Sequence, residues 1–202
     1  MTRTMKQEVL LTFILSIICT LSFAQTADEY LERGMDKYVR YQEKGIEKDI
    51  PGAIKDFTKA LSLLLDSSGI ALEKKRNRTG LDSAMIFTRR AQAKSDIEDY
   101  RGAIKDYKKA IKKGWDLPIQ YMQISDNYAK MEKYKESIHF LNKVIEHEPS
   151  EVPDKRMARA FYNRGIAKII IGNKEEGCMD LSKAGEMGYE KAYKAMQALC
   201  NN

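Results

Sequence analysis

The twelve residues YRGAIKDYKKAI at positions 100–111 repeat, almost residue for residue, the stretch IPGAIKDFTKAL at positions 50–61. Weaker copies follow at 134–145 and at 174–185. Another amphipathic segment precedes each copy and is clearest in FYNRGIAK at 161–168. Because small and apolar residues recur in these segments at the 3.6-residue period of an α-helix, the sequence predicts repeated pairs of helices.

The composition favours one all-α fold class. Of the 202 residues, 43% are hydrophobic and 32% are charged, which is typical of a soluble globular protein with one core. Only 4 prolines and 12 glycines interrupt the helical periodicity. The formal net charge is +6, but lysines alternate with Glu and Asp along the expected helices and are not predicted to form one basic face. This pattern indicates a solvated surface and does not favour nucleic-acid binding.

The paired segments resemble the tetratricopeptide repeat. In that family, helix A carries a small residue. Helix B then carries a second small residue twelve positions later, a large residue four further on and a small residue three after that. The matching positions here are Ala91, Ala103, Tyr107 and Ala110; Ser125, Ser137, Leu141 and Val144; and Gly165, Gly177, Leu181 and Ala184. Small side chains let the two helices cross closely, while large ones fill the space against the next hairpin.

This resemblance implies a right-handed α-solenoid of about four helical hairpins followed by a C-terminal capping helix. Pro118 to Glu151 is a regular 34-residue copy, with Pro149 where helix B ends in the family. Insertions are expected around 67–83 and after the first helix A, which covers about 28–41. From Tyr189 to Cys200 the apolar residues follow a single stripe, which predicts a helix that covers the open end of the stack.

The first 24 residues read as a secretory signal peptide. Arg3 and Lys6 precede an uncharged run from 9 to 23, and Ser22 and Ala24 are small residues at cleavage-site positions. We expect a periplasmic or secreted mature chain that begins near Gln25, with one repeat domain over 25–202. An uncleaved anchor is the alternative, although about 15 apolar residues are fewer than the ~20 that span a bilayer. A lipoprotein modified on Cys19 is another, but isoleucines precede Cys19 where small residues are needed.

Signal removal leaves two cysteines, Cys178 and Cys200, and an even pair in an oxidising compartment favours a disulfide. In the family, the position of Cys178 points from helix B toward the next helix. The turn between the last two helices is expected near Gly188, about 10 residues after Cys178 and about 12 before Cys200. The two sulfur atoms are therefore predicted to lie at about the same distance from the turn, next to each other on two antiparallel helices. Two free thiols in a small-residue interface remain the alternative.

Catalytic and cofactor motifs are missing from the sequence. The only histidines, His139 and His147, have no cysteine or paired carboxylate at metal-ligand spacing and are expected to be exposed on a helix. No phosphate-binding glycine loop or nucleophile elbow is found, and Asp99 sits where it would cap the following helix. We therefore expect no enzyme activity, cofactor or metal.

A protein or peptide partner is the expected ligand. In the family, helix A side chains build the concave wall that binds extended peptides or amphipathic helices. Carried over by position, this groove consists of Leu31, Met35, Tyr38, Met85, Thr88, Gln92, Met122, Asp126, Tyr162, Ile166 and Ile169. The alternative for these residues is a role in the core. The family's clamp for acidic peptide termini needs Lys, Asn and Arg at positions that are here occupied by Leu31, Met35, Thr88, Gln92 and Met122, so it is not expected. The alternative function is a structural envelope component that binds a polymer or membrane surface through the basic loop 74–78.

Overall fold

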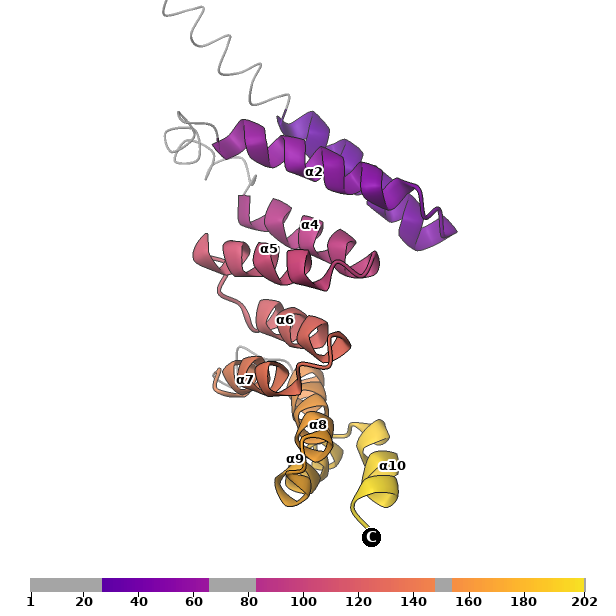
Figure 1. Cartoon of the computed structure of the whole chain (residues 1–202), viewed down its shortest axis with the longest axis vertical. Coiled ribbons are helices and arrows are strands. Elements are labelled where there is room, and N and C mark those ends of the chain that lie inside the picture. Colours follow the sequence, from indigo (N-terminus) through magenta and orange to yellow (C-terminus); the bar gives the residue numbers. More distant parts are fainter. Residues whose placement is uncertain (1–26, 66–82, 148–153, 202) are drawn as a thin grey trace, which may run out of the picture. The chain divides into compact units, whose positions relative to one another are not determined.

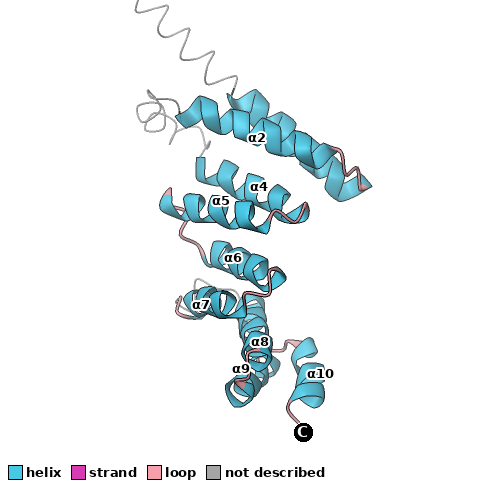
Figure 2. Ribbon diagram, in the orientation of Figure 1, coloured by secondary structure: helices cyan, strands magenta, loops and turns pink. Residues whose placement is uncertain are grey.

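A computed structural model describes residues 27–65, 83–147 and 154–201, and in these ranges it contains helices and turns without any strand (Figures 1 and 2). The all-α class predicted from the sequence is confirmed. The helices are a first one at 27–44, α2 (Asp49–Leu65), α4 (Ser83–Asp96), α5 (Tyr100–Lys112), α6 (Pro118–Lys130), α7 (Tyr134–Ile145), α8 (Asp154–Ile170), α9 (Lys174–Glu186) and α10 (Glu190–Leu199). The expected signal peptide, the basic loop 74–78 and Pro149 lie outside the described residues.

The chain divides into two compact units, 1–93 and 94–202, with the boundary inside α4. In the first unit, helix 27–44 and α2 form a hairpin whose core includes the fully buried Phe57. The residues after the expected end of the first helix extend that helix to 44. A short turn follows in which Gly45 adopts a φ of 64°, a conformation that glycine tolerates without strain. The irregular first repeat is therefore a complete hairpin with a lengthened helix A.

In the second unit, α6 packs against α7, α7 against α8 and α8 against α9. The Asp99 carboxylate accepts a hydrogen bond from the Gly102 backbone amide, which confirms the expected N-terminal cap of α5. The predicted 118–151 copy starts with Pro118 at the first position of α6, where the missing amide hydrogen of proline costs nothing.

Small residues meet where the helices of a hairpin cross. Ser125 and Ser137 are both buried and their Oγ atoms lie 2.8 Å apart. Gly165 and Gly177 bring two backbones together so closely that a Cβ added to either one would lie 2.7 Å from the other's carbonyl oxygen. The expected close crossing is confirmed in both hairpins, because only small side chains permit this separation.

A lysine–aspartate ion pair recurs beside these crossings, and it was not predicted from the sequence. A buried aspartate of helix B binds a lysine of helix A in three hairpins: Lys37 with Asp56 at 2.7 Å, Lys94 with Asp106 at 2.9 Å, and Lys168 with Asp180 at 3.0 Å. At the same two positions of the third hairpin the structure has Tyr128 and Phe140, whose rings stack with centroids 5.6 Å apart. The signal was present in the sequence as a lysine twelve residues before an aspartate in the second and fourth copies.

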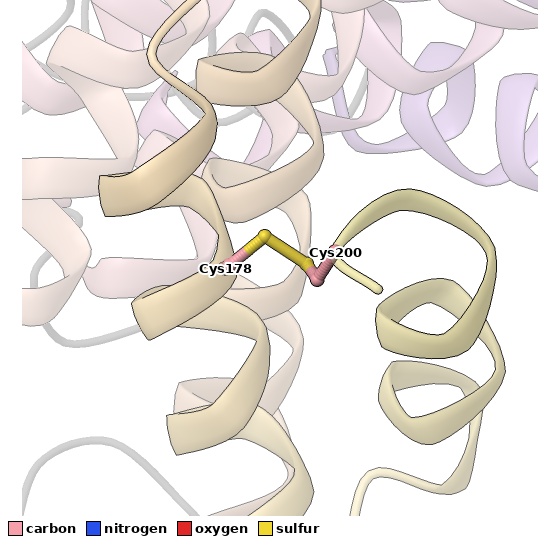
Figure 3. Close-up of a disulfide and its surroundings, with 2 residues drawn as sticks. All are labelled: Cys178 and Cys200. Atoms are coloured by element: carbon pink, nitrogen blue, oxygen red, sulfur yellow. A yellow bond between two sulfur atoms is a disulfide. The ribbon is translucent and has the colours of Figure 1, made fainter. Parts of the chain in front are cut away.

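The C-terminal helix α10 packs against α9 as the expected final helix. Few of its side chains are buried: Ala192 is fully buried, whereas Tyr193 is 55% exposed and donates a hydrogen bond to the Gly185 carbonyl at 2.9 Å. At the far end of this helix, Cys200 faces Cys178 of α9, with a Cα–Cα distance of 5.9 Å and the sulfurs at disulfide distance, 1.98 Å (Figure 3).

Candidate partner-binding surface

The expected groove residues of the first unit lie on helix 27–44 and α4, and they differ in accessibility. Leu31 is 8% exposed and is therefore a buried residue, while Met35 and Tyr38 are half-buried. On α4, Met85, Thr88 and Gln92 are also half-buried. The polar groups of the last two are engaged locally: Thr88 donates to the Ala84 carbonyl, and the Gln92 side-chain oxygen accepts from Arg89.

In the second unit, Met122 is not a surface residue. Its side chain is fully buried in a cluster with Leu141, Val144 and Met157, between α6, α7 and α8. Position in the repeat placed it on the inner wall, but Met122 belongs to a buried cluster to which the following helix A contributes Met157 and Ala160. Met122 contributes to the core and is not accessible to a partner in this structure.

Asp126 joins two helices along the inner wall of the second unit. Its carboxylate accepts hydrogen bonds from Arg159 and, at 3.1 Å, from the Asn163 amide, both on α8. Burial raises the pKa of Asp126, an effect that the Arg159 guanidinium opposes. The sequence analysis missed Arg159 and Asn163, although their four-residue spacing places them on one face of a helix.

The adjoining face of α8 is apolar. Tyr162, Ile166 and Ile170 follow each other at four-residue intervals and so form one stripe along the helix. The first two are half-buried, whereas Ile170 is 53% exposed. Ile170 was not among the expected site residues. The expected Ile169 is half-buried and lies against Gly177 of the same hairpin, so it serves the helix crossing.

At one end of the stripe, the Tyr162 ring contacts the ring of Tyr189. The Tyr162 ring lies 5.0 Å from that of Tyr189, the residue that precedes α10, with the ring planes tilted by 48°. Of the expected groove residues in this unit, Asp126, Tyr162 and Ile166 are thus partly accessible, and Met122 is not.

The two histidines occupy different environments. His139 is exposed, as expected, but His147 lies beyond the end of α7 and is half-buried, with its ring 5.9 Å from that of Tyr121.

Burial, together with a hydrogen bond to Asp116, raises the pKa of Tyr121 to about 12, so this phenol stays protonated at physiological pH. Among the described residues, no group of three or more His, Cys, Asp or Glu side chains could hold a metal ion.

Comparison with known proteins identifies the repeat. The tetratricopeptide repeat profile matches residues 121–151. Residues 121–151 are a tetratricopeptide repeat. This match falls on the third hairpin, the regular copy that the sequence analysis singled out, and it confirms the resemblance. No curated protein matches the sequence significantly.

Solved tetratricopeptide structures share the fold of this chain. The MamA RS-1 ArsTM double mutant is 17% identical, with a TM-score of 0.62 over 86% of this chain and 83% of that one. The N-terminal domain of stress-induced protein-1 from C. elegans is 19% identical, with a TM-score of 0.54 over 58% of this chain and 94% of that one. At such low identity these similarities establish the tetratricopeptide fold and no more. In the ranges that the structure describes, no helix is both long and apolar enough to cross a membrane.

Proposed function

We propose that this protein is an exported, non-catalytic adaptor that binds an extended peptide or an amphipathic helix of a partner protein along its helix A surfaces. In the second unit the binding surface consists of Asp126, Tyr162, Ile166 and Ile170. In the first unit it includes Met35, Tyr38 and the accessible α4 residues Met85, Thr88 and Gln92. Leu31, Met122 and Ile169 support this surface from behind.

The exposed apolar stripe of α8 carries this proposal. An isoleucine that is 53% exposed gains free energy when a partner covers it, and the half-buried Tyr162 and Ile166 extend the apolar strip on the same face. Asp126, with Arg159 and Asn163, supplies polar groups beside the strip that can orient a peptide backbone. An apolar strip with a few fixed polar groups suits a helix or an extended segment.

Site-specific photocrosslinking in the native host tests this surface. With a benzoylphenylalanine at Ile170, we expect adducts with one defined segment of a partner protein, identified by mass spectrometry. Adding Ile166→Glu to the same chain should reduce the adduct about tenfold or more, because a buried anchor of an interface is typically worth roughly 2 kcal/mol.

Met179 provides the matched control. It is an apolar residue on α9 that is 71% exposed, so a crosslinker there reports nonspecific hydrophobic contact. The proposal requires adducts from position 170 and not from 179, with an unchanged circular dichroism spectrum for the Ile166→Glu variant. Equal yields from both positions, or adducts that survive Ile166→Glu, would show that the partner binds elsewhere.

We further propose that residues 1–24 are removed on export and that Cys178 and Cys200 form a disulfide in the mature protein. The short distance between the two cysteines supports this, as does the small amount of apolar surface that α10 buries. In the chain-entropy view, closing a loop of this length stabilises the folded state by roughly 3 kcal/mol. The bond would hold α10 on α9 where packing alone is weak.

Mass spectrometry of protein purified from its native host checks both proposals. We expect an intact mass that corresponds to a chain starting at or near Gln25, without lipid. After denaturation without reductant, alkylation should modify no thiol, and after reduction it should modify two. A mass that includes the first 24 residues would exclude cleavage, and two reactive thiols before reduction would exclude the disulfide.

A further inference from the structure

A cleft of about 660 Å³ lies on the first hairpin, between helix 27–44 and α2. Its walls carry cations from both helices: Arg33 and Lys37 from one, Lys55 and Lys59 from the other. Each pair is spaced by four residues, which places its members one turn apart on the same face. The single carboxylate in the cleft belongs to Asp56, so four cations face one anion and the cleft has a net charge of +3.

Both carboxylate oxygens of Asp56 accept hydrogen bonds from the cations of helix 27–44. Its two oxygens accept from Arg33 at 3.1 Å and from Lys37 at 2.7 Å. Lys55 and Lys59 are exposed, and neither has a carboxylate partner among the described residues.

The last hairpin supplies an internal comparison. There a cleft of about 570 Å³ contains Arg164 and Lys168, which occupy the same repeat positions as Arg33 and Lys37. In that cleft Lys168 binds Glu176 at 3.1 Å, and Arg164 binds the underlying Asp180 through two hydrogen bonds. Lys135 and Glu146 of α7 also line this cleft, so its three cations face two carboxylates, Glu146 and Glu176, with Asp180 beneath them. This cleft, which is formed with α7, therefore carries a smaller excess of positive charge than the cleft of the first hairpin.

We propose that the cleft lined by Arg33, Lys37, Lys55 and Lys59 binds a phosphate group of a multiply charged phosphorylated ligand. This is a second binding site, separate from the helix A surface of the proposed adaptor function. The ammonium groups of Lys55 and Lys59, which pair with no carboxylate in the described ranges, contact the phosphate oxygens. The Arg33 side chain is 55% exposed and its guanidinium lies 4.3 Å from the centre of the Tyr30 ring, so it adds N–H donors that Asp56 leaves unused.

The size and chemistry of the cleft favour a phosphate over an acidic peptide. Its volume is within the roughly 300–1,000 Å³ range of small-molecule sites, whereas a peptide needs a longer groove with partners for its backbone. Cations from both helices line this one cleft, which suits a compact group with several charged oxygens. A soluble phosphorylated molecule and a phospholipid headgroup both present such a group.

Isothermal titration with inorganic tripolyphosphate tests the site directly. We expect binding that weakens with added salt and that falls about tenfold or more in the double variant Lys55→Gln/Lys59→Gln, because two charge-assisted hydrogen bonds are lost. The matched control is Lys105→Gln/Lys109→Gln. These lysines occupy the same repeat positions on α5, outside the cleft, and their replacement changes the net charge equally. Circular dichroism verifies that both variants are folded.

Two further measurements distinguish a phospholipid headgroup from a soluble phosphorylated molecule, and a phosphate ligand from an acidic peptide. Cosedimentation with phosphatidylcholine vesicles that contain phosphatidic acid, displaced by tripolyphosphate, would identify a lipid headgroup as the ligand. Tripolyphosphate binding without vesicle binding would identify a soluble one. No binding of tripolyphosphate, equal weakening in both double variants, or tighter binding of a poly-glutamate peptide would overturn the phosphate site. None of these outcomes depends on crosslinking at α8, so the two proposals can fail separately.

Discussion

Replacing Asp180 with asparagine is expected to lower the free energy of unfolding by about 3 kcal/mol, because it leaves the largely buried Arg164 without its carboxylate partner and Lys168 with only Glu176. The Asp180 side chain is 8% exposed and receives two hydrogen bonds from Arg164, at 2.8 and 2.6 Å, and one ion pair from Lys168. Both cations are themselves largely buried. Asparagine keeps the size of the side chain, so the loss measures the charge and not a cavity.

Urea unfolding followed by circular dichroism measures this loss, and Glu186→Gln on the same helix is the control. Glu186 pairs with Lys183 at 3.2 Å, but both side chains are more than half exposed. Exposed pairs of this kind contribute roughly 0–1 kcal/mol, so the control should differ little from the parent protein. If Asp180→Asn were as stable as Glu186→Gln, the recurring Lys–Asp pairs would not stabilise the hairpins.

The second large effect is expected for Gly165→Ala, which should destabilise the protein by about 1–3 kcal/mol, toward the upper end of the range for overpacked sites. An added Cβ would lie 2.7 Å from the Gly177 carbonyl oxygen and 3.1 Å from Leu181 Cγ. Because the nearest atom belongs to the backbone, α8 and α9 must move apart to make room. That movement disturbs packing along the whole hairpin.

Gly52→Ala is the control, and it is not expected to lower the free energy of unfolding. Gly52 also lies within a helix, but its added Cβ would meet only the flexible end of the Lys37 side chain, at 3.1 Å. Alanine favours a helix over glycine by up to about 1 kcal/mol, so this change should be neutral or stabilising. Chemical denaturation of both variants, with parent protein alongside, checks the pair. Equal effects at the two positions would mean that the close approach of Gly165 and Gly177 is unimportant.

The accessibility of the residues in the proposed binding surface was predictable only in part. Repeat register placed Tyr162 and Ile166 on helix A, and both are partly accessible on α8. The same register placed Met122 on the surface, but the structure buries it in a cluster that includes Met157 of the next helix A. Whether a helix position is open depends on the side chain that the next helix A brings over it. That side chain lies far along the sequence, so local periodicity does not indicate it.

The helices, their pairing into hairpins and the small residues at the crossings could all be predicted from the amino-acid sequence. It could do so because a helix face and a close crossing each leave a local, periodic pattern, as Gly165 and Gly177 show. Which lysines pair with a carboxylate could be seen only in the three-dimensional structure. Lys37 and Lys168 occupy equivalent positions, yet Lys168 binds Glu176 as well as its aspartate, while beside Lys37 neither Lys55 nor Lys59 pairs with a carboxylate of the described residues. Such pairing depends on distances between side chains from different helices, and a pattern along one helix does not contain them.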